Sequence, residues 1–303
     1  MVDLDRLATT EARNPKTLDL DSMSPAELLA TINQEDAKVA PAVALALPQI
    51  AQAVEAVTQA LAAGGRLIYL GAGTSGRLGL LDAAECPPTF GVAPDLVVGL
   101  LAGGNAAFMR AVEGAEDRAD WAVADLDRIG LSARDAVVGL AASGRTPYVI
   151  GGLDQARALG AVTIAIACNR GAEVSSHADI AIEVDNGPEI LTGSTRLKAG
   201  TSQKLILNMI STAAMVRLGK VYGNLMVDLR PTNQKLVARA VAIVGAATGC
   251  DPTTAGQALA EADNQAKTAI VMLLAAVDAD TARSRLRRAN GFVRDAINPS
   301  SQD

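Results

Sequence analysis

The stretch RLIYLGAGTSGR (residues 66–77) decides the fold of this chain. An apolar run, LIYLG, stops at a glycine and is followed at once by more glycines and by the hydroxyl residues Thr74 and Ser75. A short apolar run bounded by glycines predicts a buried strand. A glycine-rich turn that leads from a strand into a helix is typical of a site that binds phosphate. We therefore expect a strand–turn–helix unit whose turn holds an anion.

Strands and helices alternate along the chain after this turn. Apolar runs predict strands at residues 67–71, 96–103, 136–143, 162–168 and 180–184. Helical stretches lie between them and after them, at residues 76–86, 105–128, 147–159, 171–176 and 197–218. This β-α-β order predicts an α/β fold with a doubly wound, parallel, five-stranded sheet flanked by helices. Ligands of such sheets bind at the carboxyl ends of the strands.

Helical segments precede and follow the predicted sheet. Ser24 is an expected N-cap with Glu27 three residues later, the spacing of a capping box, and apolar periodicity then predicts helix from about 35 to 62. Residues 232–303 predict three or four short helices. We expect three parts: an N-terminal arm with helices, the sheet domain and a small C-terminal helical subdomain, at residues 1–55, 56–225 and 226–303.

Composition excludes several classes of function. The 303 residues carry a net charge of −6, which gives no electrostatic footprint for nucleic acid. Three cysteines without a CxxC pair, and the single His177, cannot complete a metal site, so we expect no metal and free thiols in a reducing compartment. Neither a signal peptide nor a membrane-spanning stretch is visible. We expect a cytoplasmic protein with no nucleic-acid or membrane partner.

A dinucleotide is the first alternative for the glycine-rich turn, because its spacing fits G-x-G-x-x-G. A dinucleotide site also needs an acidic residue at the end of the second strand, but that strand ends in GLLAGGN, and Asp95 lies at its start. No lysine follows Gly76, which excludes a nucleotide triphosphate P-loop. The turn is better explained as a compact cradle for one phosphate.

Three loops share this composition. The first offers Gly73, Thr74, Ser75 and Gly76, the second (ASGRTP) offers Ser143, Gly144, Arg145 and Thr146, and the third (192–204) offers Ser194 and Lys198. Each loop alone is equally well explained as an ordinary turn or helix cap, with Ser194 or Thr195 as the cap of the last helix. On successive sheet ends, they together predict a site for a small, hydroxyl-rich, phosphorylated molecule.

Two carboxylates are unusually placed. Pro87 predicts that the helix ends at Cys86, which puts Glu85 in its last turn, where the helix dipole disfavours the ionised form and favours a general acid. Glu116 is expected on one helical face with Glu113 and Asp117, held over the sheet end as a base. The alternatives are an idle exposed glutamate and a solvated charged face. His177 is better explained as a loop or core residue than as a catalyst.

The chain resembles the N-acetylmuramic acid 6-phosphate etherase family, which has the sugar isomerase (SIS) fold and is related to the glucokinase regulatory protein. The resemblance runs from about residue 21 to the end and is carried by long, ordered motifs: GAGTSGRLGLLDAAECPPTFG, AGGNAAFMRAVEGAED, AASGRTPYVIGGL, TGSTRLKAGTSQKLILNMIST and GKVYGNLMVDL. It implies that residues 56–225 form a SIS phosphosugar-binding domain.

The resemblance also implies a reaction. The family cleaves the lactyl ether of N-acetylmuramic acid 6-phosphate to N-acetylglucosamine 6-phosphate and D-lactate in cell-wall recycling, by elimination and then water addition, without a cofactor. The family's catalytic carboxylates fall on Glu85, expected to protonate the leaving oxygen, and on Glu116, expected at C2, although the division could be reversed. The three loops would bind the phosphate and hydroxyls. The family is homodimeric, and the 197–218 helix and the N-terminal helices are the expected interface.

Two rival functions stay open on the sequence. An aldose–ketose phosphosugar isomerase would keep the phosphate loops but needs no acid aimed at C3. A phosphosugar-binding regulatory protein would use the same pocket without turnover. A DNA-binding sensor is disfavoured, because the residues between 21 and 62 hold only one lysine, Lys38, and no arginine.

Overall fold

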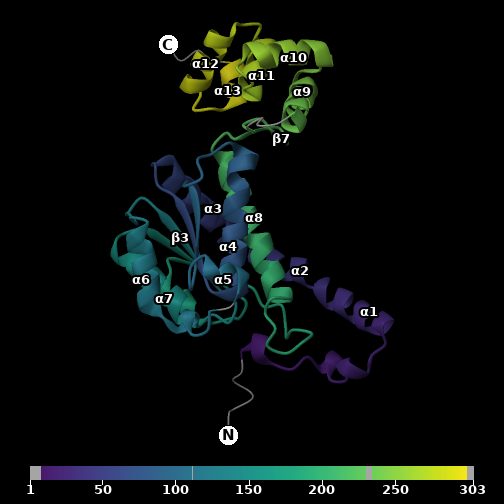
Figure 1. Ribbon diagram of the computed structural model, residues 1–303, viewed down its shortest axis with the longest axis vertical. Helices are drawn as coiled ribbons and strands as arrows, with labels where there is room; N and C mark the ends of the chain where they lie inside the picture. Colours follow the sequence, from purple (N-terminus) through teal and green to yellow (C-terminus); the bar gives the residue numbers. More distant parts are fainter. Residues whose placement is uncertain (1–7, 111, 230–233, 299–303) are drawn as a thin grey trace. The chain divides into compact units, whose positions relative to one another are not determined.

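A five-stranded parallel sheet organises the computed structural model, which describes residues 8–110, 112–229 and 234–298 (Figure 1). Its strands lie in the order β2-β1-β3-β4-β5, which confirms the α/β prediction. They run β1 Leu67–Gly71, β2 Val97–Leu101, β3 Ala136–Ala141, β4 Val162–Ala167 and β5 Ile180–Glu183. Gly71, the last residue of β1, lies opposite Leu101 of β2 and Leu140 of β3. The turns that follow these strands therefore leave the same edge of the sheet.

Helices cover both faces of the sheet. On one face α7 (Pro147–Ala158) packs beside α6 (Ala119–Arg128), and on the other lie α3 (Leu47–Ala62) and the first part of α4 (Gly73–Phe90) (Figure 1). The approach is close enough to require glycine: a Cβ on Gly152 of α7 would lie 2.0 Å from Leu70 Cδ2, and one on Gly79 of α4 would lie 2.8 Å from Tyr69 Cβ. Small aliphatic residues and glycines thus form the core between sheet and helices.

The N-terminal segment lies with the sheet in one compact unit. It consists of short 3₁₀ turns at Thr9–Glu11, Pro15–Thr17 and Leu20–Ser22, then α1 (Pro25–Asp36), α2 (Val39–Ala44) and α3. The predicted capping box at Ser24 and Glu27 is present. The helix expected from 35 to 62 is broken into pieces, because Pro48 in the first turn of α3 has no N–H to continue the preceding helix.

Two predicted helices have different bounds. α4 ends at Phe90 instead of Cys86, because prolines near a helix end remove only one backbone bond each, and Gly91, with φ of +65°, ends the helix by donating its N–H to the carbonyl of Pro87. The helix expected at 105–128 is instead α5 (Ala106–Met109), a 3₁₀ turn (Ala115–Asp117) and α6. Gly114, with φ of +71°, breaks the helical path between them.

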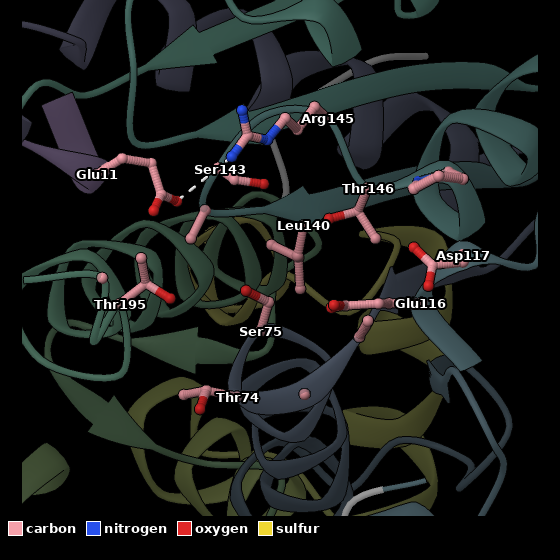
Figure 2. Close-up of a pocket in the computed structure, with 15 residues that line it drawn as sticks. Glu11, Thr74, Ser75, Glu116, Asp117, Leu140, Ser143, Arg145, Thr146 and Thr195 are labelled. Atoms are coloured by element: carbon pink, nitrogen blue, oxygen red, sulfur yellow. Dashed lines mark ion pairs between the residues drawn. The ribbon is translucent and has the colours of Figure 1, made fainter. Parts of the chain in front are cut away.

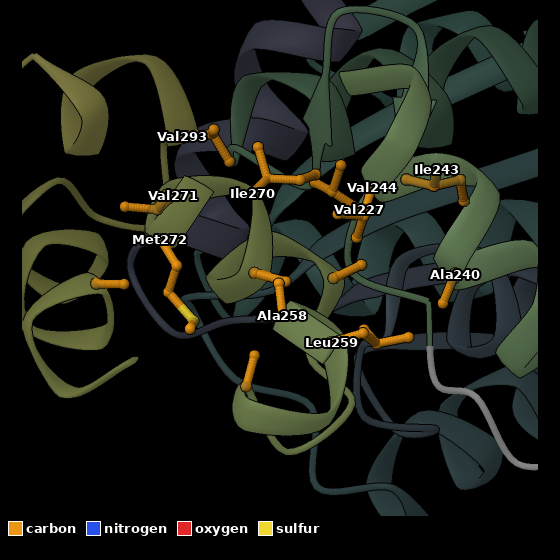
Figure 3. Close-up of a cluster of buried hydrophobic side chains, with 14 of the residues drawn as sticks. Val227, Ala240, Ile243, Val244, Ala258, Leu259, Ile270, Val271, Met272 and Val293 are labelled. Carbon is orange, nitrogen blue, oxygen red and sulfur yellow. The ribbon is translucent and has the colours of Figure 1, made fainter. Parts of the chain in front are cut away.

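A second compact unit has its own apolar core, shown in Figure 3. It contains Glu85–Pro94 and Thr212–Asp303, and the first unit contains Met1–Ala84 and Asp95–Ser211. The chain thus clusters in two units whose boundaries differ from the three parts expected. After α8 (Lys198–Arg217), which runs from the first unit into the second, come β6 Val221–Tyr222, β7 Leu225–Met226, α9 Gln234–Thr248, α10 Pro252–Glu261, α11 Ala266–Ala275, α12 Ala279–Arg288 and α13 Val293–Ile297.

Neither a disulfide nor a ready metal site is found among the described residues. Cys86, Cys168 and Cys250 are not in disulfides, and among the described residues no group of three or more His, Cys, Asp or Glu side chains is placed to hold a metal ion. In the described part of the chain no single helix is long and apolar enough to span a membrane; one bent pair, Pro25–Ala44 with Leu47–Ala62 at 61°, passes by length and composition.

Gly76 gives a direct test of this packing. A Cβ at this position would lie 2.4 Å from the carbonyl oxygen of Gly71 and 2.6 Å from Leu101 Cδ1. We expect Gly76→Ala to lower the free energy of unfolding by about 1–3 kcal/mol, because the first turn of α4 must move away from β1. Urea unfolding followed by circular dichroism measures this. Gly200→Ala, whose Cβ would meet atoms only at 3.5 Å or more, is the matched control and should not be destabilised by a clash.

Candidate functional site

A cavity of about 490 Å³ opens at the carboxyl edge of the sheet, within the first compact unit. Residues from the turn after β1, the turn after β3, the 3₁₀ turn before α6, the segment before α8 and the N-terminal arm all reach it (Figure 2). Its walls are made by Glu11, Ala72, Gly73, Thr74, Ser75, Glu116, Asp117, Leu140, Ala142, Ser143, Arg145, Thr146, Pro147, Gly193 and Thr195.

The turn after β1 forms one wall. Gly73, with φ of +53°, begins α4, so the unpaired N–H groups of its first turn are at the cavity. Ser75 is nearly buried and donates its hydroxyl to Gln203 Oε1 at 2.9 Å, which fixes its orientation. Gly76 does not line the cavity; its role is to let α4 approach Gly71. This wall therefore combines helix N–H groups with a held hydroxyl oxygen.

The turn after β3 forms the facing wall in the same way. Ser143, Arg145 and Thr146 line the cavity, and Gly144, with φ of +77°, makes the turn beneath them. A Cβ on Gly144 would lie 2.4 Å from Ala172 Cβ, so this position requires glycine. Thr146 precedes α7 but makes no side-chain capping bond, so its hydroxyl is free to serve a ligand. The predicted repetition of the first loop by the second is thus present in space.

The third loop contributes differently from what its sequence predicts. Gly193 and Thr195 line the cavity, whereas Ser194 does not. The expected cap of α8, Ser194 or Thr195, is replaced by Glu189, whose carboxylate accepts the backbone N–H groups of Lys198 at 3.0 Å and Ala199 at 2.9 Å. Burial raises the pKa of Glu189, against the lowering effect of these two bonds. Because Glu189 caps the start of α8, Thr195 does not serve as the cap and lines the cavity instead.

Lys198 is not placed to bind a ligand in this cavity, contrary to expectation. Its side chain is 1% exposed, and its ammonium donates to Glu35 Oε2 and to the carbonyl of Asn186, each at 2.9 Å. Burial tends to raise the pKa of Glu35, but hydrogen bonds from Lys38 and Lys198 outweigh it and lower that pKa to about 2. Lys198 therefore joins α8 to the end of α1 as one half of a buried ion pair.

Glu116 and Asp117 line the cavity, although not on a helix. Both belong to the 3₁₀ turn Ala115–Asp117, and Glu113 lies in the loop before it, so the expected single helical face does not exist. Figure 2 shows the Glu116 side chain directed between Ser75 and Thr146. A carboxylate is therefore placed beside the hydroxyl groups of both turns, as a base at the sheet end requires.

Glu85 is not part of this cavity within one chain. Its side chain is exposed and belongs to the second compact unit. Nearly three turns of α4 separate it from Ser75, at about 3.6 residues a turn. Because α4 continues to Phe90, Glu85 lies before the last turn of the helix, whereas the sequence predicted it within that turn. Glu85 is therefore not among the described residues that line this cavity, and its catalytic role stays a prediction.

Three residues that sequence reasoning missed support the cavity. Glu11 reaches it from the N-terminal arm and lies 3.5 Å from Arg145 Nη2. Asn169, buried, binds Thr10 and the turn after β3, and Gln203 orients Ser75. The sequence gives little indication of these roles, because each is a single polar residue that lies far along the chain from the turn that it contacts. His177, by contrast, pairs with Asp154 at 2.7 Å and does not line the cavity.

Comparisons with known proteins place this fold and site in a class. A family model described as the glucokinase regulatory protein N-terminal SIS domain matches residues 49–157, and the SIS domain model matches residues 127–213. A parallel sheet with a hydroxyl-lined cavity at its carboxyl edge and these two matches define a SIS-domain protein.

Full-length relatives give the family. The N-acetylmuramic acid 6-phosphate etherase of Mycolicibacterium smegmatis is 65% identical over 288 residues, which cover 95% of this chain and 97% of that protein. The etherase of an Exiguobacterium species is 60% identical over 294 residues, covering 97% of this chain and all of that protein. That of Vibrio vulnificus is 56% identical over 297 residues, covering 98% and 99%. The chain belongs to the N-acetylmuramic acid 6-phosphate etherase family, as its motifs predicted.

The buried ion pair of Glu35 with Lys198 predicts a pH-dependent stability. Because the pKa of Glu35 is lowered to about 2 in the folded chain, its contribution is present above about pH 4.5 and is lost as the pH falls toward 2. Glu35→Gln leaves the Lys198 ammonium buried without its carboxylate, and we expect a loss of about 3–5 kcal/mol at pH 7 that shrinks below pH 4.

Urea unfolding at pH 7, 5 and 3 measures this difference. Glu55→Gln, at an exposed position of α3, is the control and should change the unfolding free energy by less than about 0.5 kcal/mol at every pH. If Glu35→Gln is as stable as the unsubstituted chain at pH 7, the pair does not contribute as described.

Proposed function

We propose that this chain cleaves the D-lactyl ether of N-acetylmuramic acid 6-phosphate, releasing N-acetylglucosamine 6-phosphate and D-lactate, in peptidoglycan recycling. The observation that carries the proposal is the near-full-length identity of 65% to a protein named for this activity. A cavity with hydroxyl groups, helix N-termini and a carboxylate supports it, because these groups suit a phosphosugar and a proton transfer. The isomerase and the regulatory protein are less favoured, since the full-length relatives are named as etherases.

The phosphate and sugar hydroxyls would be held by the turns after β1 and β3. Each turn opens a helix of ten or more residues, α4 or α7, whose first N–H groups and positive dipole end favour a phosphate. The hydroxyls of Thr74, Ser75, Ser143, Thr146 and Thr195 add further hydrogen-bond partners at the cavity. Gly76 and Gly144 support these turns without lining the cavity, and Ser194, in the segment before α8, does not line it either.

Elimination begins from the open-chain aldehyde, whose C1 carbonyl acidifies the proton on C2. Glu116 removes that proton, the bond between C3 and the ether oxygen breaks, and lactate leaves with a proton from an acid. Water then adds to the C2–C3 double bond, with oxygen to C3 and a proton to C2, which gives N-acetylglucosamine 6-phosphate. These steps need a base at C2, and Glu116 lies in the cavity beside Ser75 and Thr146.

Glu85 is assigned as the acid that protonates the leaving oxygen, and we propose that it acts in the cavity of a second copy. Its exposure on α4 supports this, because it is available to a neighbouring chain. The exposed leucines of the N-terminal helices, Leu29 and Leu45, support a homodimer that buries them. A cytoplasmic location and a reaction without metal or organic cofactor stay predictions of the sequence.

Glu116→Gln tests the base. We expect D-lactate release from N-acetylmuramic acid 6-phosphate to fall by about 10²–10⁴-fold, because the amide cannot accept the C2 proton. Binding of N-acetylglucosamine 6-phosphate, measured by calorimetry, should change by less than about threefold. Glu113→Gln, three residues away and outside the cavity, is the control and should stay within about twofold of the unsubstituted enzyme.

The same assay separates the rival functions. An isomerase would interconvert aldose and ketose 6-phosphates without lactate, and a regulatory protein would bind N-acetylmuramic acid 6-phosphate and leave it unchanged. Either result with the unsubstituted chain would overturn the etherase proposal.

Mixed dimers test the position of Glu85. One chain carries Glu85→Gln, the other carries Glu116→Gln, and the two are co-expressed with different tags and purified through both. If Glu85 serves the neighbouring cavity, one of the two cavities in the mixed dimer has both carboxylates, and lactate release returns, although each variant alone is inactive. If Glu85 serves its own cavity, the mixed dimer stays inactive and the proposed exchange is wrong.

A further inference from the structure

The cavity holds one cationic side chain among the residues that line it in the described part of the chain, and this is Arg145. Three carboxylates line the same cavity, those of Glu11, Glu116 and Asp117, and Arg145 pairs with the first of them. A ligand with two anionic groups is repelled by these carboxylates, so the placement of the single guanidinium decides where one of the two anions binds.

Glu11 is fixed beside Arg145 by buried polar contacts of the N-terminal arm. The backbone N–H of Thr10 donates to Asn169 Oδ1 at 3.1 Å, and Asn169 Nδ2 donates to Thr10 Oγ1 at 3.0 Å. The same Nδ2 contacts the carbonyl oxygens of Ala142 and Ser143 in the turn after β3. Thr10 and Asn169 are 3% and 4% exposed. The arm is therefore clamped to the turn that carries Arg145.

The pair between Glu11 and Arg145 is loose enough to leave the guanidinium available. The distance from Arg145 Nη2 to Glu11 Oε1 is 3.5 Å, and the Arg145 side chain is 59% exposed. An exposed ion pair of this kind contributes little to the free energy of folding. It does hold one side of the guanidinium, and the remaining N–H groups can bind a second carboxylate in the two-pronged geometry that arginine favours.

We propose that Arg145 binds the carboxylate of the lactyl group, and that Glu11 is a positioning residue that holds the guanidinium for it. The inference rests on the proposed function, which supplies a substrate with a phosphate and a carboxylate. The phosphate has partners already, in the N–H groups that open α4 and α7 and the hydroxyls beside them. The lactyl carboxylate then needs a partner of its own, and Arg145 is the one cationic side chain among the described residues that line the cavity.

Binding of the product shows whether Arg145 contacts the phosphate or the lactyl carboxylate of the substrate. N-acetylglucosamine 6-phosphate keeps the phosphate and lacks the lactyl carboxylate. Substitution of a residue that binds only the carboxylate should therefore not change the affinity for this product. For Arg145→Gln we expect KM for N-acetylmuramic acid 6-phosphate to rise about 10- to 100-fold, as for loss of a charge-assisted pair. The dissociation constant of N-acetylglucosamine 6-phosphate, measured by calorimetry, should stay within about threefold.

Glu11→Gln tests the positioning role. We expect KM for N-acetylmuramic acid 6-phosphate to rise about three- to tenfold with kcat within about twofold, because binding of the carboxylate is lost equally from the ground and transition states. Glu11→Asp, which keeps the charge, should recover part of the loss. Arg170→Gln, an exposed arginine outside the cavity, is the control and should leave both constants unchanged.

Each remaining outcome overturns the inference. If Arg145→Gln weakens binding of the substrate and of N-acetylglucosamine 6-phosphate equally, Arg145 binds the phosphate. If it weakens the binding of neither, Arg145 does not bind the ligand. An unchanged KM for Glu11→Gln removes the positioning role. Binding of N-acetylglucosamine 6-phosphate also reports that each variant is folded, and Arg145→Lys, which keeps the charge without the fork, should lie between. Failure of the unsubstituted chain to release lactate would overturn the proposed function instead.

Discussion

The register of β1 against β3 is the constraint on which the site depends. Gly71 lies opposite Leu140, so the two turns that follow these strands leave the sheet side by side. Each turn leads directly into a helix, α4 or α7, whose N-terminus is at the cavity. A shift of one residue would move one turn away from the other and turn the alternating side chains to the opposite face. The packing of glycines against Tyr69 and Leu70 fixes this register by holding both helices close to the sheet.

A second set of interactions fixes the segment before α8. Glu189 caps α8, Lys198 pairs with Glu35, and Ser202 donates to Asn186 Oδ1 at 2.8 Å, all in the buried interior. Such groups are costly to bury without partners, and apart from Asn186 Nδ2 the groups named here have them, so the network tolerates few arrangements of these chain segments. Thr195 and Gly193 reach the cavity because the residues around them are held in this way. The polar interior therefore positions residues of the site without itself lining the cavity.

The sequence alone was sufficient to predict the sheet and the two glycine-rich turns that form facing walls of the cavity. The strands and their parallel pairing, both glycine-rich turns and the capping box at Ser24 follow from local pattern, and local pattern is what a single sequence displays. The sequence was not sufficient where the role of a residue depends on a contact with a residue distant in the chain. The sequence shows that Lys198 is cationic but not that Glu35 lies 2.9 Å away, and it shows Pro87 but not that α4 tolerates it. Glu11 and Asn169 were missed for the same reason, since their contacts are made only in the folded chain.

The charge balance of the cavity explains why backbone groups matter here. Its described lining residues include three carboxylates and one guanidinium, so these side chains alone have a net negative charge when all are ionised. A phosphorylated acid would be repelled by such a set of side chains. The positive ends of α4 and α7 supply the opposing field, and they do so at fixed positions, since both helices are packed on the sheet. In the proposed reaction, carboxylates for proton transfer could thus lie next to an anionic ligand, because backbone dipoles would neutralise its phosphate in place of lysines that would compete for those carboxylates.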